Sequence, residues 1–255
     1  MAKFLMADAK IIKIAQLKET IFDFTIENEE LAKKALCGQF IHVDCGDNFT
    51  LRRPISICEI NDTSLRFIFD VRGKGTSALS LKKVGDTINV LGPLGNTFGL
   101  PDKKALVLGG GIGIYPLLEL SKQIKPDTIS LGFRSKELIT LKNEFKPLTN
   151  NLVIATDDGS YGFSGNALAA VIDRINKGDF EVVYACGPLP MIKAIKEITD
   201  KINIECQISL EERMGCGIGA CLCCTVKTPD DTELGFKHLH VCKNGPIFNA
   251  REVLL

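Results

Sequence analysis

The sequence lacks an excess of charge of either sign, and it lacks any long apolar run. Its 31 Lys and Arg residues balance 31 Asp and Glu residues, and no basic stripe is visible. Nucleic acid is therefore a poor candidate partner, because binding to phosphates requires clustered positive charge. No stretch reaches the roughly 18 consecutive apolar residues of a membrane-spanning helix, so we expect no membrane partner.

The beginning of the chain also lacks an export signal. Met1–Lys10 has neither an apolar core nor a small-residue cleavage site. We therefore expect a cytoplasmic protein, in a reducing compartment where disulfides are rare. Ten cysteines in such a chain indicate metal or redox chemistry. Six cysteines lie outside the motif described next, and most are expected to be small buried side chains: Cys37, Cys45, Cys58, Cys186, Cys206 and Cys223.

The most informative motif lies near the carboxyl end. Cys216, Cys221 and Cys224 stand at the spacing C-x4-C-x2-C, and Cys242 follows 18 positions later. This is the plant-type ferredoxin spacing for a [2Fe–2S] cluster. Three glycines allow the amides of this loop to turn towards the cluster sulfurs: Gly215, Gly217 and Gly219.

The same cysteines could instead bind zinc, pack in a core or belong to a Rieske centre. A four-cysteine zinc site usually combines two C-x2-C pairs, and this chain has one. Inert core cysteines are the simplest alternative. His238 and His240 suggest a Rieske centre, but its Cys-x-His pattern is absent at Cys216. Cys223 is predicted not to be a ligand, because the spacing is complete without it.

The chain divides into three segments with different patterns. Residues 1–99 contain short alternating runs that predict a six-stranded antiparallel β-barrel. Residues 100–208 alternate apolar strands with helical stretches, including 166–176 and 190–200, which predicts a doubly wound parallel α/β sheet. Residues 209–255 would form a small cluster-binding module. The expected strands are 11–17, 20–26, 40–44, 55–58, 65–69, 87–91, 105–108, 128–133, 152–155 and 182–185.

The barrel segment contains a candidate phosphate-binding arginine. Pro54 fixes its own φ and favours an extended backbone at Arg53. Arg53 can then pair with a phosphate in a bidentate manner, while Ser56 hydrogen-bonds a polar ring edge. An arginine on a solvated strand is the ordinary alternative.

A glycine-containing loop downstream adds a second phosphate-binding candidate. Gly73 and Gly75 allow a ligand to approach the backbone closely. The amides of Thr76 and Ser77 are predicted to open a helix over residues 77–81, where a pyrophosphate can bind.

The second segment has glycine loops after its strands. Residues 109–113 follow a strand and are predicted to open a helix whose amides receive a pyrophosphate. The spacing is not G-x-G-x-x-G, because position 114 is Ile, so a plain strand-to-helix turn is an alternative. The loops 156–160 and 184–188 also follow strands, at the edge where open α/β sheets bind ligands. Cys186 would border a nicotinamide ring or be a buried thiol.

Together these blocks resemble the ferredoxin–NADP reductase superfamily. Their order, with a plant-type cluster motif at the carboxyl end, is similar to a narrower family, the electron-transfer subunits of dihydroorotate dehydrogenase B. The most specific stretches are Glu212–Cys221 and Val241–Phe248, and the resemblance covers nearly the whole chain.

The resemblance implies three sets of binding residues. For FAD they are Arg53, Pro54, Ile55, Ser56, Ile68, Phe69, Asp70, Gly75 and Thr76. For the cluster they are Cys216, Cys221, Cys224 and Cys242, and for NAD they are Gly110, Gly111, Gly113, Cys186 and Gly187. Asp70 departs from relatives that place an arginine near the flavin phosphates, and Arg72 is a candidate substitute.

The resemblance also implies a function in pyrimidine biosynthesis. The chain would be an oxidoreductase subunit that relays electrons from an FMN-containing catalytic subunit through [2Fe–2S] and FAD to NAD⁺. The complex is expected to be a heterotetramer with two copies of each subunit. No residue is assigned to the oxidation of dihydroorotate. One rival is the flavin and iron–sulfur subunit of an NAD(P)H–ferredoxin oxidoreductase or sulfide dehydrogenase, and another is a non-catalytic cluster-binding module.

Overall fold

The computed structural model describes residues 4–46 and 48–255 and divides into two compact units. The first, called here the barrel unit, consists of Met1–Thr97, Glu211–Thr225 and Leu239–Pro246. The second, called the sheet unit, consists of Phe98–Leu210, Val226–His238 and Ile247–Leu255. All four cysteines of the motif therefore belong to the barrel unit.

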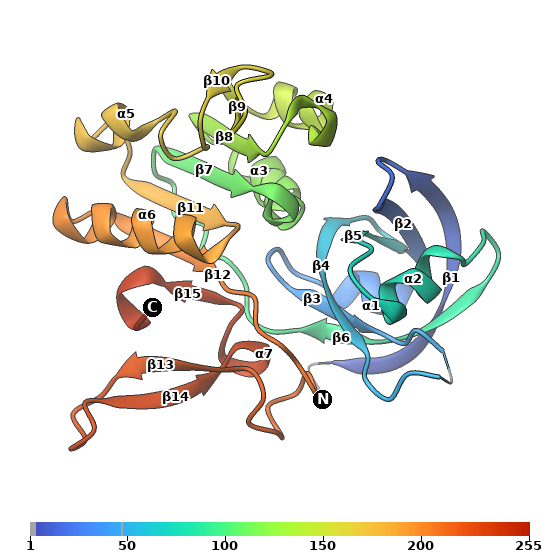
Figure 1. Cartoon of the computed structure of the whole chain (residues 1–255). Helices are drawn as coiled ribbons and strands as arrows, with labels where there is room; N and C mark the ends of the chain where they lie inside the picture. Colours follow the sequence, from blue (N-terminus) through green and yellow to red (C-terminus); the bar gives the residue numbers. More distant parts are fainter. Residues whose placement is uncertain (1–3, 47) are drawn as a thin grey trace. The chain divides into compact units, whose positions relative to one another are not determined.

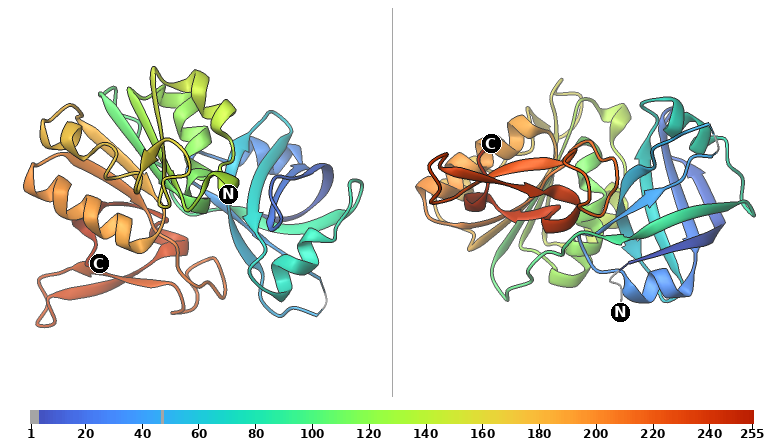
Figure 2. Two further views of the ribbon diagram at one scale, coloured as in Figure 1. Left: turned by 45° about the horizontal axis from the view of Figure 1, so that its top comes forward. Right: turned by 90° about the horizontal axis from the view of Figure 1, so that it is seen from below.

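The barrel unit is built on six antiparallel strands that close in the order β1-β2-β5-β4-β3-β6 (Figure 2). This confirms the predicted barrel. The strands are β1 (Leu5–Gln16), β2 (Ile21–Glu27), β3 (Phe40–Val43), β4 (Arg53–Ile60), β5 (Ser64–Asp70) and β6 (Thr87–Leu94). Two short helices join them: α1 (Glu29–Lys34) and α2 (Lys74–Ser80).

Strand β1 is longer than the alternating pattern predicts because it closes the barrel. Its first half pairs with β6, from Leu5 opposite Gly92 to Lys10 opposite Thr87. Its second half pairs with β2, ending with Gln16 opposite Phe22. A closed barrel leaves no free strand edge, so the backbone hydrogen bonds of the strands are satisfied within it.

The barrel interior is filled by alternate strand residues. Phe24 and Phe67 are completely buried, with ring centroids 5.7 Å apart. Phe69 packs edge-on against Phe24 at 5.2 Å. Aromatic pairs at these distances add to the stabilisation that comes from burying their area. This core fixes the strands β4 and β5, which carry candidate site residues.

The sheet unit is built on seven strands in the order β10-β9-β8-β7-β11-β12-β15 (Figure 1). All neighbours are parallel except β12 and β15, which confirms the predicted parallel sheet. The strands are β7 (Ala105–Gly110), β8 (Thr128–Phe133), β9 (Asn151–Thr156), β10 (Phe163–Ser164), β11 (Val182–Cys186), β12 (Glu205–Ser209) and β15 (Ile247–Asn249).

Helices and a hairpin complete the chain. Helix α3 packs against β7, and α6 packs against β11 and β12. The helices are α3 (Pro116–Ile124), α4 (Lys142–Phe145), α5 (Ile172–Asn176), α6 (Leu189–Lys201) and α7 (Val241–Asn244), with 3-10 turns at Gly111–Ile114, Lys136–Leu138, Lys146–Leu148 and Ala250–Glu252. Strands β13 (Thr225–Pro229) and β14 (Phe236–His240) form a two-stranded sheet.

The helix predicted over 166–176 is longer than the one in the structure. Only Ile172–Asn176 is α-helical, because Val171 has φ −129° and ψ 3°, outside the helical region. Residue Asn166 instead accepts a hydrogen bond from the N–H of Ala169 through its side chain and organises a turn. Five strands are additions to the predicted set, since runs of two to five residues give little periodic signal: β10, β12, β13, β14 and β15. The predicted boundaries of the three segments stay a prediction.

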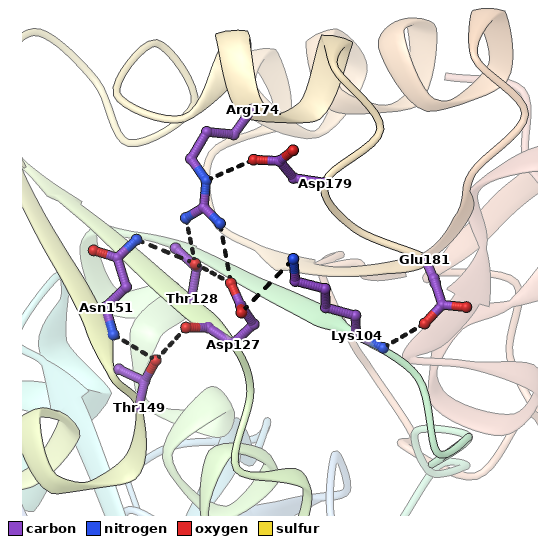
Figure 3. A network of polar contacts seen from close by, with 8 residues as sticks. All are labelled: Lys104, Asp127, Thr128, Thr149, Asn151, Arg174, Asp179 and Glu181. Carbon is purple, nitrogen blue, oxygen red and sulfur yellow. Dashed lines mark hydrogen bonds and ion pairs between the residues drawn. The ribbon is translucent and has the colours of Figure 1, made fainter.

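The amino ends of the parallel strands are tied together by a polar network (Figure 3). Arg174 donates to Thr128 Oγ1 at 2.7 Å, to Asp127 Oδ2 at 3.1 Å and to Asp179 Oδ2 at 3.0 Å. Burial raises the pKa of Asp127, but hydrogen bonds from Thr128 and Arg174 outweigh it and lower the pKa. Lys104 is a more distant partner, with Nζ 4.0 Å from Asp127. The network anchors α5 to the sheet.

Within residues 4–46 and 48–255, none of the helices has both the length and the apolar character needed to cross a membrane.

We expect Arg174→Met to lower the free energy of unfolding of the sheet unit by about 1 kcal/mol, because it removes three hydrogen bonds at a partly exposed site. Urea titration followed by circular dichroism measures the change. Lys104→Met is the matched control beside the same carboxylate and should cost less than about 0.5 kcal/mol. Equal losses in the two variants would contradict the assigned role of Arg174.

Candidate functional site

The four cysteines of the motif lie in one region of the barrel unit, and their exposure differs. Cys216 and Cys221 are partly exposed in the loop that precedes β13. Cys224 and Cys242 are buried, and Cys242 lies in the short helix α7. The side chains hydrogen-bond in two pairs, Cys216 with Cys221 and Cys224 with Cys242.

Backbone amides of the loop point at the sulfurs. Gly219 N–H donates to Cys242 Sγ at 3.1 Å. Three more N–H groups donate to Cys216 Sγ: those of Ile218 at 3.5 Å, Ala220 at 3.3 Å and Cys221 at 3.4 Å. Hydrogen bonds of this kind stabilise negative charge on sulfur, which is the form that binds iron.

Two glycines are required for this winding of the loop. Gly217 has φ +73° and Gly219 has φ +80°, where other residues are strained. A Cβ on Gly219 would lie 2.6 Å from Lys243 Cδ, and one on Gly217 would lie 2.6 Å from His42 Nδ1. Space and backbone conformation therefore both require glycine at these two positions. Gly215, the third glycine named for this loop, is not among the glycines with positive φ, and a Cβ there would lie at an ordinary 3.4 Å from Cys221 Sγ.

The pKa values of the thiols indicate which of them can carry a negative charge. Burial raises the pKa of Cys216, but the amides of Ile218 and Cys221 outweigh it and lower the pKa to about 6. Burial, together with the neighbouring Cys224, raises the pKa of Cys242 to about 12. A Cys242 thiolate beside Cys224 is therefore disfavoured unless a cation lies next to it, and bound iron would supply that charge.

The donor atoms of the loop suit a two-iron cluster. Among the described residues, no group of three or more His, Cys, Asp or Glu side chains is found that could hold a metal ion. The loop nevertheless supplies cysteine sulfurs, and backbone amides donate hydrogen bonds to those of Cys216 and Cys242, as a [2Fe–2S] cluster requires. Zinc is the less favoured alternative because a four-cysteine zinc site usually combines two C-x2-C pairs, and this chain has one.

The flavin candidates from two parts of the barrel unit come together. A Cβ on Gly75 would lie 2.5 Å from Arg53 Nη2 and 2.6 Å from Cζ, so the guanidinium lies directly on Gly75. Arg53 also donates to the carbonyl of Leu51 and lies over the ring of Phe49, 5.6 Å from its centroid. The sequence-distant phosphate candidates Arg53 and Gly75 are thus neighbours.

The start of helix α2 corrects one expectation. The helix begins at Lys74 rather than Ser77, with Gly73 as its N-cap residue. The Thr76 hydroxyl accepts hydrogen bonds from the N–H groups of Arg72 at 3.0 Å and Gly73 at 3.2 Å. Thr76 therefore lies in the first turn and closes the loop back on itself.

The other flavin candidates lie on β4 and β5. Ile55 and Phe69 belong to the barrel core, so any contact they make with a ligand must use backbone atoms. Ile68 is also buried, whereas Pro54 and Ser56 are partly exposed. Asp70 forms an ion pair with the exposed Arg72, whose Nε lies 3.0 Å from Asp70 Oδ2. The pair balances charge locally, and the substitution of a family arginine by Arg72 stays a prediction.

The nucleotide candidates gather at the carboxyl edge of the parallel sheet, where such sheets bind ligands. Strand β7 is followed by the turn Gly111–Ile114, and its neighbour β11 ends at Cys186. A Cβ on Gly113 would lie 2.5 Å from the carbonyl oxygen of Cys186. A Cβ on Gly187 would lie 3.0 Å from the Gly110 nitrogen. Around Gly111, by contrast, there is open space for a ligand.

Sequence reasoning missed one residue beside the cysteine loop. His42 is completely buried on β3 and lies against Gly217. The only signal in the sequence is a polar residue between Ile41 and Val43 in an apolar strand.

Comparisons with known proteins cover nearly the whole chain. Residues 211–254 match the family model described as the iron-sulfur cluster binding domain of dihydroorotate dehydrogenase B. The chain is 41% identical over 249 residues to the "Dihydroorotate dehydrogenase B (NAD(+)), electron transfer subunit" of Caldanaerobacter subterraneus subsp. tengcongensis, covering 96% of this chain and 97% of that protein. A protein of the same name from Enterococcus faecalis is 39% identical, with the same coverage.

Solved structures agree with the fold. The chain matches the structure titled for an NADH-dependent reduced ferredoxin-NADP oxidoreductase with a TM-score of 0.83 and 32% identity, over 97% of this chain and 90% of that one. A ferredoxin NADP+ reductase from Neisseria gonorrhoeae, with bound FAD and NADP, matches with a TM-score of 0.65 and 20% identity, over 84% of this chain and 95% of that one. The second match shows the fold alone.

For the cysteine loop we expect each of four Cys→Ser variants to lose or grossly alter the EPR signal of the reduced protein, because a serine oxygen is a poor replacement for a thiolate on iron. The variants are at Cys216, Cys221, Cys224 and Cys242. Cys223→Ser is the matched control in the same loop and should keep the signal, since Cys223 is exposed. An unchanged signal in Cys242→Ser, or a lost one in Cys223→Ser, would show that the ligand set is wrong.

For the flavin we expect Arg53→Ala to weaken FAD binding by roughly 2–3 kcal/mol, the scale of a charged hydrogen-bonded contact. Flavin retained after dialysis measures the effect. Arg52→Ala is the control, because Arg52 is already bonded to Asn89 Oδ1 at 2.5 Å and lies 3.6 Å from Asp44. Equal flavin retention in both variants would remove Arg53 from the site.

Proposed function

We infer that this chain works as an electron relay, because it belongs to the family of the electron-transfer subunits of dihydroorotate dehydrogenase B (NAD(+)). It is an oxidoreductase subunit of pyrimidine biosynthesis. The matches to its relatives cover 96% of this chain and 97% of each relative, so they include nearly the full length of those subunits. FAD, a [2Fe–2S] cluster and NAD⁺ are its redox groups.

The observation that carries this function is the cysteine loop. Four thiols in two pairs, with four amide donors, suit a one-electron iron–sulfur centre. When bound, FAD supplies the conversion between the two-electron chemistry of NAD⁺ and the one-electron chemistry of the cluster. We assign the cluster to Cys216, Cys221, Cys224 and Cys242.

The remaining site residues bind and orient the other two groups. Arg53, held against Gly75, would present a positive charge to the flavin pyrophosphate. The loops at Gly113 and Cys186 pack closely on each other, and together they would form the surface on which the nicotinamide nucleotide binds. Substrate oxidation is assigned to the partner catalytic subunit, because the relatives of this chain are named electron-transfer subunits.

The rival role in an NAD(P)H–ferredoxin oxidoreductase or sulfide dehydrogenase is not favoured. A structure titled for such a ferredoxin-NADP enzyme is 32% identical to this chain. The electron-transfer subunits reach 41% and 39% identity, and the iron–sulfur segment matches their own family model. The family match therefore points to an FMN-containing catalytic subunit as the partner.

The subunit count and the cellular location belong to the same proposal. We assign a heterotetramer with two copies of each subunit and a cytoplasmic location. Membership in a family of pyrimidine-biosynthesis subunits supports this location.

We expect the isolated chain to reduce artificial dyes with NADH but not to oxidise dihydroorotate. The hydride site is assigned to this chain, and the substrate base is not. Adding the FMN subunit should create dihydroorotate-dependent NAD⁺ reduction, followed at the absorbance of NADH. Dihydroorotate turnover by the isolated chain at the rate of the complex would exclude the relay function.

The partner surface is expected to include the cysteine loop, where Ile218 and Leu222 are exposed apolar side chains. Ile218→Glu should weaken assembly with the FMN subunit, seen by size-exclusion chromatography, and leave NADH–dye activity in place. Val84→Glu is the control at another exposed apolar position of the barrel unit. Assembly that is equally strong in both variants would place the interface elsewhere.

A further inference from the structure

His42 lies on the outer face of the barrel strand that pairs with the flavin strand. In the β3–β4 register, His42 is opposite Pro54 and Phe40 is opposite Ser56. Directly opposed residues point to the same face of a sheet. Their neighbours Ile41 and Val43 point into the barrel core, so His42 shares the outer face with the two flavin candidates Pro54 and Ser56.

The cysteine segment covers this outer face. A Cβ on Gly217 would lie 2.6 Å from His42 Nδ1, 3.2 Å from His42 Cε1 and 3.2 Å from Leu94 Cδ1. Further along β3 the covering continues, because Phe40 lies beside Gly95, which in turn packs on Pro246. His42 is therefore 0% exposed, between the flavin strand and the loop of Cys216.

The imidazole has unmet hydrogen-bonding capacity. Neither His42 Nδ1 nor His42 Nε2 has a hydrogen-bond partner among the described residues, although both atoms are buried. Burial, with the nearby charges of Arg52 and Arg53, lowers the pKa of His42 to about 4. The ring is thus neutral at physiological pH and carries one N–H donor and one acceptor. Buried polar groups left without partners are costly and rare in native proteins.

We propose that His42 is a positioning residue that donates a hydrogen bond from its ring to an electron-rich acceptor of the redox groups on this face, either a polar edge of the flavin or a sulfur of the cluster. The inference rests on the proposed function, because that function places both groups beside β4 and the cysteine loop. It gives the unpaired donor a partner.

A hydrogen bond to a redox group favours its reduced, more negative state and raises its potential. Removal of the donor should therefore lower the potential of whichever group accepts the bond. The cluster potential follows from EPR-monitored redox titration, and the flavin potential follows from visible absorbance. The two measurements distinguish the two acceptors.

The experiment compares three variants of the full chain, loaded with both groups. His42→Leu removes the ring nitrogens, and His42→Asn keeps an N–H donor near the position of Nδ1. Leu94→Val is the matched control, because it alters packing against the same glycine without removing a polar atom. We expect His42→Leu to shift one reduction equilibrium tenfold towards the oxidised form, or 59 mV for a one-electron step. His42→Asn should restore most of the shift, and Leu94→Val should cause none.

Two results would overturn the inference. One is a His42→Leu protein with both potentials unchanged, as expected if a buried water satisfies the ring. The other is an equal shift in His42→Asn or Leu94→Val, which would indicate a packing effect. If His42→Leu fails to retain a redox group, retention by His42→Asn supports the inference and its loss there contradicts it. A wild-type chain that binds neither flavin nor cluster would instead remove the proposed function itself.

Discussion

The need to direct backbone amides at the sulfurs of Cys216 and Cys242 constrains both the cysteine loop and the barrel surface beneath it. The N–H groups can reach Cys216 and Cys242 only if the loop winds through positive φ at Gly217 and Gly219. That winding brings the backbone so close to His42 and Lys243 that no Cβ fits. The loop is therefore shaped jointly by the sulfurs it surrounds and by the barrel surface beneath it.

The pair β3–β4 links this loop to the remainder of the barrel. One face of the pair fills the core with Ile41, Val43 and Ile55. The other face carries His42 and Pro54 and is covered by the cysteine segment. Packing density in the core resists any shift of the strands, so residues on the outer face are held in place from beneath. Pre-organisation of this kind suits a site that must hold redox groups without rearranging around each electron.

In the sheet unit, the stabilising polar network and the candidate nucleotide residues lie at opposite ends of the same strands. At the amino ends, Arg174 ties together Asp127, Thr128 and Asp179. At the carboxyl ends, the backbone of Gly113 packs closely on that of Cys186, and the backbone of Gly187 packs closely on that of Gly110. Parallel strands place their carboxyl ends at one edge, so the short loops after β7 and β11 lie side by side, as the proposed nucleotide site requires.

The sequence by itself determined the chemistry of the cysteines and the class of each sheet, because ligand spacing and strand periodicity are local properties. It also indicated Arg53 and Gly75 as two separate candidates for binding the flavin phosphates. Only the tertiary structure placed the guanidinium of Arg53 on Gly75, started α2 at Lys74 and ended the predicted helix 166–176 short. The role proposed for His42 depends entirely on the fold. Its burial arises from a loop about 175 residues away in the chain, at Gly217, and its ring nitrogens have no hydrogen-bond partner within the part of the chain that the structure describes.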